Sequence, residues 1–231
     1  MFPILNYVVN RYLFMKRSIL FLLVNSFLFL FSCNNRSQEE RRLNENKKEQ
    51  STAVDTTGIT GDLNNDGANF HKKLIGKGGI VFETTSSNDK LQIITTGLAN
   101  GADTVNVDID GAIYDVVSAD LDNNGFSEIY CFCSSAGSGS YGQLYAFASN
   151  KNKSLSIIYL PDIQDDVKLS DGYMGHDSFH IEKNRLIRSF PIYKETDPNA
   201  APSGGTRKIN YQLMPGEASW VLKQDSVIEI K

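Results

Sequence analysis

The sequence predicts an all-β domain, built as an antiparallel β-sandwich or a barrel-like sheet with long connecting loops. Beyond the first third of the chain, short runs rich in β-branched and aromatic residues recur roughly every ten residues. Turn signals such as Asp110-Gly111 and Pro215-Gly216 separate these runs, and helical periodicity is nearly absent. Because so few residues lie between the runs, helical crossovers between parallel strands are excluded, and the sheet is expected to be antiparallel.

The expected strands follow one another from Gly79 onward. In chain order they cover residues 79–85, 90–96, 103–109, 112–119, 127–133, 143–149, 154–160, 178–183, 185–193, 207–213 and 219–230. Residues 161–169 are expected to form the one short helix.

Residues 1–32 have the features of a secretory leader. Three basic residues precede the apolar run ILFLLVNSFLFLF, and the segment contains no acid. Its end, Leu30-Phe31-Ser32 before Cys33, resembles a bacterial lipobox, in which the cysteine is lipidated before cleavage. The alternative is a transmembrane helix with an incidental cysteine; Asn25 and Ser26 within the run favour the lipoprotein. The protein is therefore expected to be exported and tethered by lipid to a bacterial membrane, facing the periplasm or the cell surface.

After the leader, residues 33–61 form a lipidated cysteine and a polar tether, and residues 62–231 form the antiparallel β domain. The tether is mixed in charge and poor in aromatic residues, so it cannot bury enough apolar surface to fold alone, although a short surface helix in its middle is an alternative. Removing residues 1–32 takes away three basic residues and no acidic ones, which changes the net charge from −4 to −7. This charge argues against nucleic acid and anionic lipid as partners and suits a basic protein.

Of the three cysteines, Cys131 and Cys133 remain once Cys33 is assigned to the anchor. They alternate along one expected strand, so both side chains point to the same face with Cα atoms about 7 Å apart, at the edge of disulfide reach. Two core thiols are expected rather than a bridge. The cysteines and the three histidines show no spacing typical of a zinc site.

One aspartate-rich loop is a candidate for a structural calcium ion. Its oxygen ligands stand at positions one, three, five and nine of a glycine turn: Asp120, Asp122, Asn124 and Glu128. The twelfth position, where an EF-hand has glutamate, is Cys131, and the pattern instead resembles the short calcium loop between strands of propeller-type repeats. The same residues also form ordinary metal-free turns.

A second loop, beginning Asp62-Leu-Asn64-Asn-Asp66-Gly67, keeps only the first half of this pattern. It has Phe70 and Lys73 where further ligands should be, so an ordinary turn is the preferred interpretation.

No motif indicates an enzyme. His176 and Asp177 could act as a base and its orienting acid, but no nucleophile elbow, HExxH motif or Walker loop accompanies them. A histidine held in a structural corner is the simpler interpretation, and the protein is predicted not to be an enzyme.

Two loops of small residues are candidates for binding. The stretch SSAGSGSYG combines glycines, which let the backbone approach a surface closely, with short hydroxyls and one rigid amphipathic side chain, Tyr141. Residues 199–207 end in Arg207 and offer Ser203 and a guanidinium fork to an acidic partner. Each is a plain connection in the alternative interpretation.

Several separated motifs, in this order, carry a family resemblance. DLDNNGFSEIYCFCSSAGSGSYGQLYAFA, SLSIIYLP, DGYMGHDSF, RSFPIYKETDPNAAPSGGTRKINYQL and PGEASWVLK together resemble the periplasmic inhibitor of invertebrate-type (I-type) lysozyme, over residues 112–225. The lipid anchor and tether depart from a family that is soluble in the periplasm.

The resemblance implies an antiparallel β domain that blocks the active-site cleft of a lysozyme, most readily the I-type, without catalysis or a cofactor of its own. In this family a loop with serine, glycine, one spacer and tyrosine enters the cleft, and the matching residues here are Ser138, Gly139, Ser140 and Tyr141. The motif DGYMGHDSF is expected to buttress the loops. The alternative function is a calcium-stabilised glycan- or surface-protein-binding lipoprotein, and an exposed strand edge is a candidate for pairing two copies into a homodimer.

Overall fold

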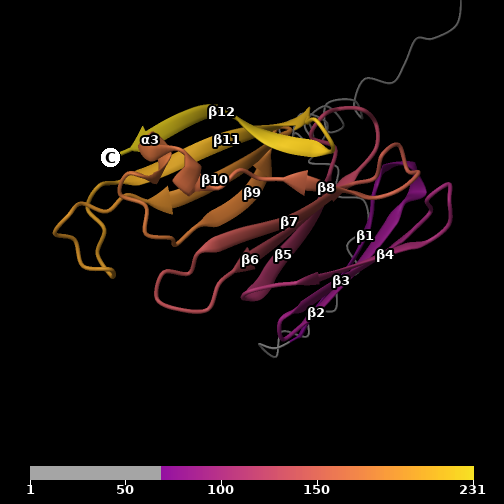
Figure 1. The fold of residues 1–231 in the computed structure, drawn as a ribbon, viewed down its shortest axis with the longest axis horizontal. Helices are drawn as coiled ribbons and strands as arrows, with labels where there is room; N and C mark the ends of the chain where they lie inside the picture. Colours follow the sequence, from indigo (N-terminus) through magenta and orange to yellow (C-terminus); the bar gives the residue numbers. More distant parts are fainter. Residues whose placement is uncertain (1–68) are drawn as a thin grey trace, which may run out of the picture. The chain divides into compact units, whose positions relative to one another are not determined.

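The computed structural model describes residues 69–231, which form two sheets (Figure 1). The first has the order β1-β2-β3-β4 and the second the order β5-β6-β7-β8-β12-β11-β10-β9. The strands are β1 (Asn69–Ile75), β2 (Val81–Ser87), β3 (Lys90–Thr96), β4 (Asp103–Asp108), β5 (Ala112–Ala119), β6 (Glu128–Ser134), β7 (Gly142–Ala148), β8 (Ser156–Tyr159), β9 (Ser178–Glu182), β10 (Arg185–Pro191), β11 (Thr206–Pro215) and β12 (Trp220–Ile230). The all-β prediction is confirmed, and the second sheet curls into a barrel-like form.

The predicted leader, the predicted lipidation site Cys33, the predicted tether and the loop that begins at Asp62 lie outside the described residues. No helix within residues 69–231 has the length and apolar character needed to cross a membrane.

Two details differ from the sequence-based expectation. β8 and β12 pair in parallel, through Trp220 with Ile158 and Val221 with Tyr159, whereas the other ladders within residues 69–231 are antiparallel. β8 and β12 are far apart in the chain, so no hairpin fixes their relative direction. β1 was not predicted because its sequence, NFHKKLI, is strongly basic and only Phe70 and Leu74 join the core.

The expected helix at 161–169 is broken into two single turns. These are the 3-10 turn η2 (Ile163–Asp165) and the helix α3 (Val167–Ser170). Asp162 accepts a hydrogen bond from the backbone N–H of Gln164, and Asp166 accepts from those of Lys168 and Leu169, so each turn has its own aspartate cap. A further 3-10 turn, η1 (Lys77–Gly79), links β1 to β2.

The strand β6 is a wall shared by two hydrophobic cores, because every residue from Glu128 to Cys133 is buried. Tyr130 and Phe132 point into the core that the second sheet encloses. Ile129, Cys131 and Cys133 point the other way, into the core between β5–β7 and the first sheet. The first sheet therefore covers the outer face of β5–β7, as Figure 1 shows.

The two strand thiols are confirmed as unpaired core residues. Cys131 and Cys133 are both buried and free. Burial raises the pKa of the Cys131 thiol far above its usual range and that of Cys133 to about 11, so both stay protonated and unreactive.

The second sheet is closed at its seam by side chains, since its end strands β5 and β9 share no ladder. The Phe179 backbone N–H donates to the Tyr114 hydroxyl at 3.0 Å, and Phe132 stacks on Phe179 with ring centroids 5.8 Å apart. Farther along the seam, the Asn184 amide donates to Asn123. Phe132 lies on β6, next to the end strand β5, so these contacts join the β5 and β9 sides of the sheet without a backbone ladder.

Candidate functional site

The connection between β6 and β7, residues 135–141, is a closed and ordered loop, called here the β6–β7 loop. The Ser135 N–H donates to the Tyr141 carbonyl at 2.9 Å, and the Tyr141 N–H donates back to the Ser135 hydroxyl at 2.9 Å. Inside this closure the Ser140 N–H donates to the Gly137 carbonyl at 3.2 Å. Gly137 adopts φ 124°, a conformation that favours glycine. The small residues thus form a shaped turn.

The segment from Asp171 to Asp177, called here the 171–177 corner, holds the tip of this loop. The His176 N–H donates to the Gly139 carbonyl at 2.6 Å. A Cβ atom on Gly175 would lie 2.1 Å from the same carbonyl oxygen, so only glycine permits this approach. The expectation that DGYMGHDSF buttresses the loops is therefore confirmed by its contacts.

A buried charge network fixes the far end of the loop, where β7 begins. One Asp177 oxygen accepts from the Gly142 N–H at 2.8 Å and from the Tyr173 hydroxyl at 2.7 Å. The other accepts from the Arg188 guanidinium at 2.6 Å, and Arg188 also donates to the Tyr173 hydroxyl at 2.8 Å. The side chains of Asp177 and Arg188 are 0% and 6% exposed, so this ion pair lies away from solvent.

Asn199, in the long connection between β10 and β11, ties a third segment to the β6–β7 loop. Its amide nitrogen donates to the Ser138 carbonyl at 3.0 Å, and its oxygen lies 3.3 Å from Nε2 of His176. The Tyr193 hydroxyl donates to the Asn199 carbonyl at 2.8 Å. Figure 1 shows the three connections gathered at one end of the second sheet.

Tyr141 is held in place yet open to solvent. The residue is 46% exposed. The ring lies over Gly139, where an added Cβ would be 2.5 Å from it, and packs edge-on against Tyr173 with centroids 5.7 Å apart. Ser138 is exposed at the loop tip, while Gly139 and Ser140 are half-buried. The four residues of the predicted binding motif therefore form one supported turn with a hydroxyl and a tyrosine facing outward.

The second predicted contact divides into an exposed and a buried part. Ser203 is exposed, and both its N–H and its hydroxyl donate to the Asp197 carboxylate, at 2.7 and 2.9 Å. Hydrogen bonds from the N–H groups of Lys194 and Ser203 lower the pKa of Asp197. This part of the β10–β11 connection is thus ordered by its own side chains.

Arg207 does not fit the expectation that its guanidinium meets a partner. The residue is 5% exposed, and its guanidinium binds the Glu229 carboxylate at 2.7 Å. It also donates to the carbonyls of Leu169 and Asp171, both at 2.7 Å. Because all these groups belong to the chain itself, Arg207 anchors the end of α3 to β11 and β12.

His176 and Asp177 do not form the imagined base and orienting acid. The Asp177 oxygens bind Gly142, Tyr173 and Arg188, whereas the His176 ring nitrogen faces Asn199. Both residues serve the architecture of the loops.

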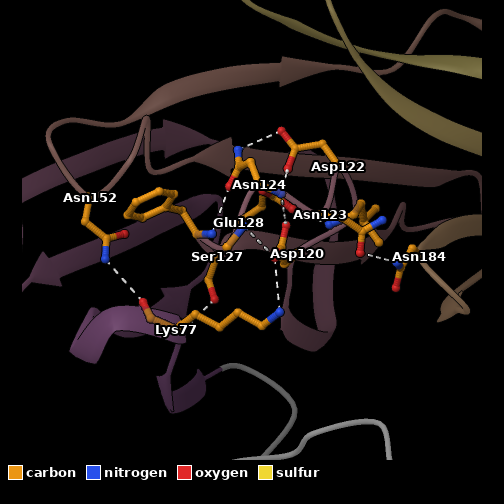
Figure 2. A network of polar contacts seen from close by, with 12 residues as sticks. Lys77, Asp120, Asp122, Asn123, Asn124, Ser127, Glu128, Asn152 and Asn184 are labelled. Carbon is orange, nitrogen blue, oxygen red and sulfur yellow. Dashed lines mark hydrogen bonds and ion pairs between the residues drawn. The ribbon is translucent and has the colours of Figure 1, made fainter. Parts of the chain in front are cut away.

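The Asp120 loop brings its carboxylates together, as Figure 2 shows. Oxygens of Asp120, Asp122 and Glu128 lie within 4.8 Å of one another. Asp120 accepts from the N–H groups of Asn124 and Gly125, both at 3.0 Å. Asp122 accepts from the Asn124 N–H and side-chain amide, at 3.0 and 2.7 Å. These bonds are those of a tight turn stabilised by its own aspartates.

Lys77 brings positive charge to this cluster, and the environment of Glu128 disfavours its ionised form. The Lys77 ammonium lies 3.1 Å from Asp120, while its backbone N–H donates to Ser127 (Figure 2). Glu128 is buried and accepts from the Leu121 N–H at 2.8 Å and the Tyr130 hydroxyl at 3.2 Å. Burial, with the nearby charges of Asp122 and Asp120, raises the pKa of Glu128 to about 8. These residue types suit calcium, so the cluster stays a candidate for that ion.

Several supporting residues of the candidate site had no signal in the sequence. Asn199 contacts Ser138, which is 61 positions away, and Arg188 and Tyr173 meet Asp177 only through the fold of the second sheet.

Comparison of the chain with protein-family models, curated proteins and solved structures finds no match.

Proposed function

We propose that this protein is a lysozyme inhibitor that inserts the turn Ser138 to Tyr141 into the active-site cleft of I-type lysozyme and so protects peptidoglycan. The observation that carries the proposal is the preformed β6–β7 loop, which is held by the 171–177 corner and Asn199 while Ser138 and Tyr141 face outward. The family resemblance of the motifs supports the same assignment.

The chemistry of the loop suits a lysozyme cleft. Such a cleft holds a protonated glutamic acid near an ionised carboxylate. A serine hydroxyl both donates and accepts hydrogen bonds, and the tyrosine adds a rigid ring with a polar end, so Ser138 and Tyr141 can satisfy both acids and fill the space of a sugar. The loop contains no charged residue between Ser135 and Tyr141, which lets it enter the cleft with little desolvation cost.

Preorganisation adds to affinity. A flexible glycine-serine loop would lose conformational freedom on binding, at about 0.5–1.5 kcal/mol for each immobilised side chain. Here the turn is already fixed at both ends and at its tip. The ordering cost is met during folding rather than during binding.

The double variant Ser138→Ala, Tyr141→Ala is expected to lose inhibition of I-type lysozyme. Loss of each desolvated contact should cost about 1–3 kcal/mol, so each substitution should weaken binding about 5- to 150-fold. The measurement is a titration of lysozyme activity with the full-length chain, with chicken-type and goose-type enzymes in parallel.

The matched control is Ser87→Ala, Tyr159→Ala, which removes an exposed serine and an exposed tyrosine from β2 and β8. It should inhibit like the wild type. Full inhibition by the Ser138, Tyr141 variant would place the contact elsewhere, and a folded wild-type protein that inhibits no lysozyme would refute the function.

The proposed location rests on Cys33 and the leader before it. Cys33→Ser is expected to abolish incorporation of labelled fatty acid and to leave the leader uncleaved, because the cysteine of a lipobox is lipidated before cleavage; in the wild type the acyl chains then attach the mature protein to the membrane. Metabolic labelling with a fatty acid and the mass of the purified protein measure the two effects. A wild-type protein that carries no label and keeps its leader would instead support the transmembrane alternative.

The alternative function is a calcium-stabilised module that binds glycans or surface proteins. It depends on the carboxylates of the Asp120 loop. Its requirement for calcium separates it from the inhibitor, whose proposed contacts lie in the β6–β7 loop. A homodimer also stays a prediction. Among the described residues, β12 has a ladder partner on its β8 side only at Trp220 and Val221, so the rest of that strand edge is open to pairing with a second copy. Light scattering of the purified protein would detect the dimer.

A further inference from the structure

The β6–β7 loop is too small to make a stable protein complex alone. It contains seven residues, 135–141, and two of its side chains, Ser138 and Tyr141, form the outward-facing contact described above. A stable interface needs about 800 Å² and roughly 20–30 residues from each partner. A lysozyme that receives this loop must therefore also meet the segments packed beside it.

The 171–177 corner is the segment that lies closest to the loop. The His176 N–H is bonded to Gly139, Gly175 approaches the same carbonyl, and the Tyr173 ring packs against Tyr141. The corner cannot move away from the loop without breaking these contacts. The residue between Tyr173 and Gly175 follows directly after the tyrosine whose ring packs against Tyr141.

That residue is Met174, which is 41% exposed. Its neighbours in the corner are engaged, since Tyr173 bonds Asp177 and Arg188 and His176 faces Asn199. An exposed methionine is flexible and polarisable, so it adapts to irregular apolar surfaces and makes favourable contacts with aromatic rings. Methionine is also enriched at protein interfaces relative to the rest of the surface.

We propose that Met174 is a contact residue of the same lysozyme-binding surface and that it packs on an apolar or aromatic group at the rim of the cleft. This inference rests on the proposed function and extends it to a second segment of the chain. The loop supplies polar contacts inside the cleft, and Met174 supplies apolar contact at its edge, where surrounding residues exclude water from the central hydrogen bonds.

The test combines an affinity measurement with a direct view of the side chain. Met174→Ala in the full-length chain is expected to weaken inhibition of I-type lysozyme by about 5- to 30-fold, while thermal unfolding stays unchanged. The matched control is Ile157→Ala on β8, which is 59% exposed and should inhibit like the wild type.

Labelling the methionine methyl groups with carbon-13 gives an internal comparison. On addition of lysozyme, the NMR signal of Met174 should shift or broaden. Met214 should not respond, because it lies near the other end of β11, about 27 Å along the strand from Thr206.

The outcomes separate the two proposals. If the wild type inhibits while Met174→Ala inhibits equally well and the Met174 signal stays unmoved, this inference is overturned and the proposed function stands. If the wild type inhibits no lysozyme, both fail together. An equal loss of inhibition in Ile157→Ala would also overturn the inference, because the effect would then not be specific to Met174.

Discussion

Replacing Asp177 by alanine is expected to destabilise the folded domain by about 3–5 kcal/mol, the cost of removing one partner from a buried ion pair. The substitution leaves the Arg188 side chain, which is 6% exposed, without its counter-charge. It also removes the acceptor for the Gly142 N–H and the Tyr173 hydroxyl. The free energy of unfolding, measured by urea denaturation followed by circular dichroism, checks the effect.

The matched control is Asp108→Ala, which breaks an exposed pair with Lys90. No measurable loss of stability is expected there, because exposed ion pairs contribute little in water. Asp177→Asn should fall between the two, since the amide keeps an acceptor for Gly142 and loses the charge facing Arg188. Equal stability of Asp177→Ala and wild type would mean that the network does not hold the sheet.

Glu128→Gln is expected to stabilise the domain near neutral pH. The pKa of Glu128 is raised from 4.5 to about 8, chiefly by burial. Between these values the folded state holds a proton that the unfolded state has released, so the free energy of unfolding falls as pH rises, by about 1.4 kcal/mol per pH unit. Below this range both states are protonated, and above it both are ionised. The stability that the wild type has at acid pH is therefore lost progressively as the pH rises from about 4.5 toward 8.

Glutamine keeps the acceptor for Leu121 and Tyr130 and carries no charge toward Asp120 and Asp122. At about pH 7 the variant should exceed the wild type by up to about 3 kcal/mol, and the two should converge at acid pH. Urea denaturation at several pH values in the presence of a chelator measures this difference. Glu217→Gln, at an exposed position, is the control that should follow the wild type.

The same two proteins test calcium. Binding would require an ionised Glu128, so millimolar calcium should raise the melting temperature of the wild type above pH 8 and leave Glu128→Gln unchanged if the cluster holds the ion. A wild-type melting temperature that does not respond to calcium would remove that ion from the description of this loop.

In the pH series, a Glu128→Gln variant with the same pH dependence as the wild type would contradict the raised pKa of Glu128.

Local patterns predicted most of the strands because alternation and turn residues act over a few positions. The run at 90–96 matches β3, and that at 112–119 matches β5. β1 could not be predicted because its seven residues include two lysines and a histidine and only two core residues, too few to show an alternating pattern. The parallel pairing of β8 and β12 could not be predicted, since ladder direction depends on the path of the sixty residues between the two strands.

The candidate site was predictable only in part for the same reason. The composition of the β6–β7 loop, together with the family resemblance, singled out Ser138 to Tyr141. What fixes the loop comes from distant parts of the chain: Asp177 holds Gly142, 35 positions away, and Asn199 holds Ser138. The sequence does not indicate that Arg207 is engaged within the chain, because its partner Glu229 lies 22 positions away and only the fold brings the two together and buries Arg207.

The shared wall formed by β6 limits how this protein can change over time. Strands with one solvent face tolerate substitution at every second position, but β6 is buried from Glu128 to Cys133. A slip of one residue in its register would exchange the side chains of the two cores. We expect amino-acid substitutions to accumulate in partly exposed strands such as β4 and β12. A substitution in β6 should instead require a compensating change in the residues that pack against it in the two cores.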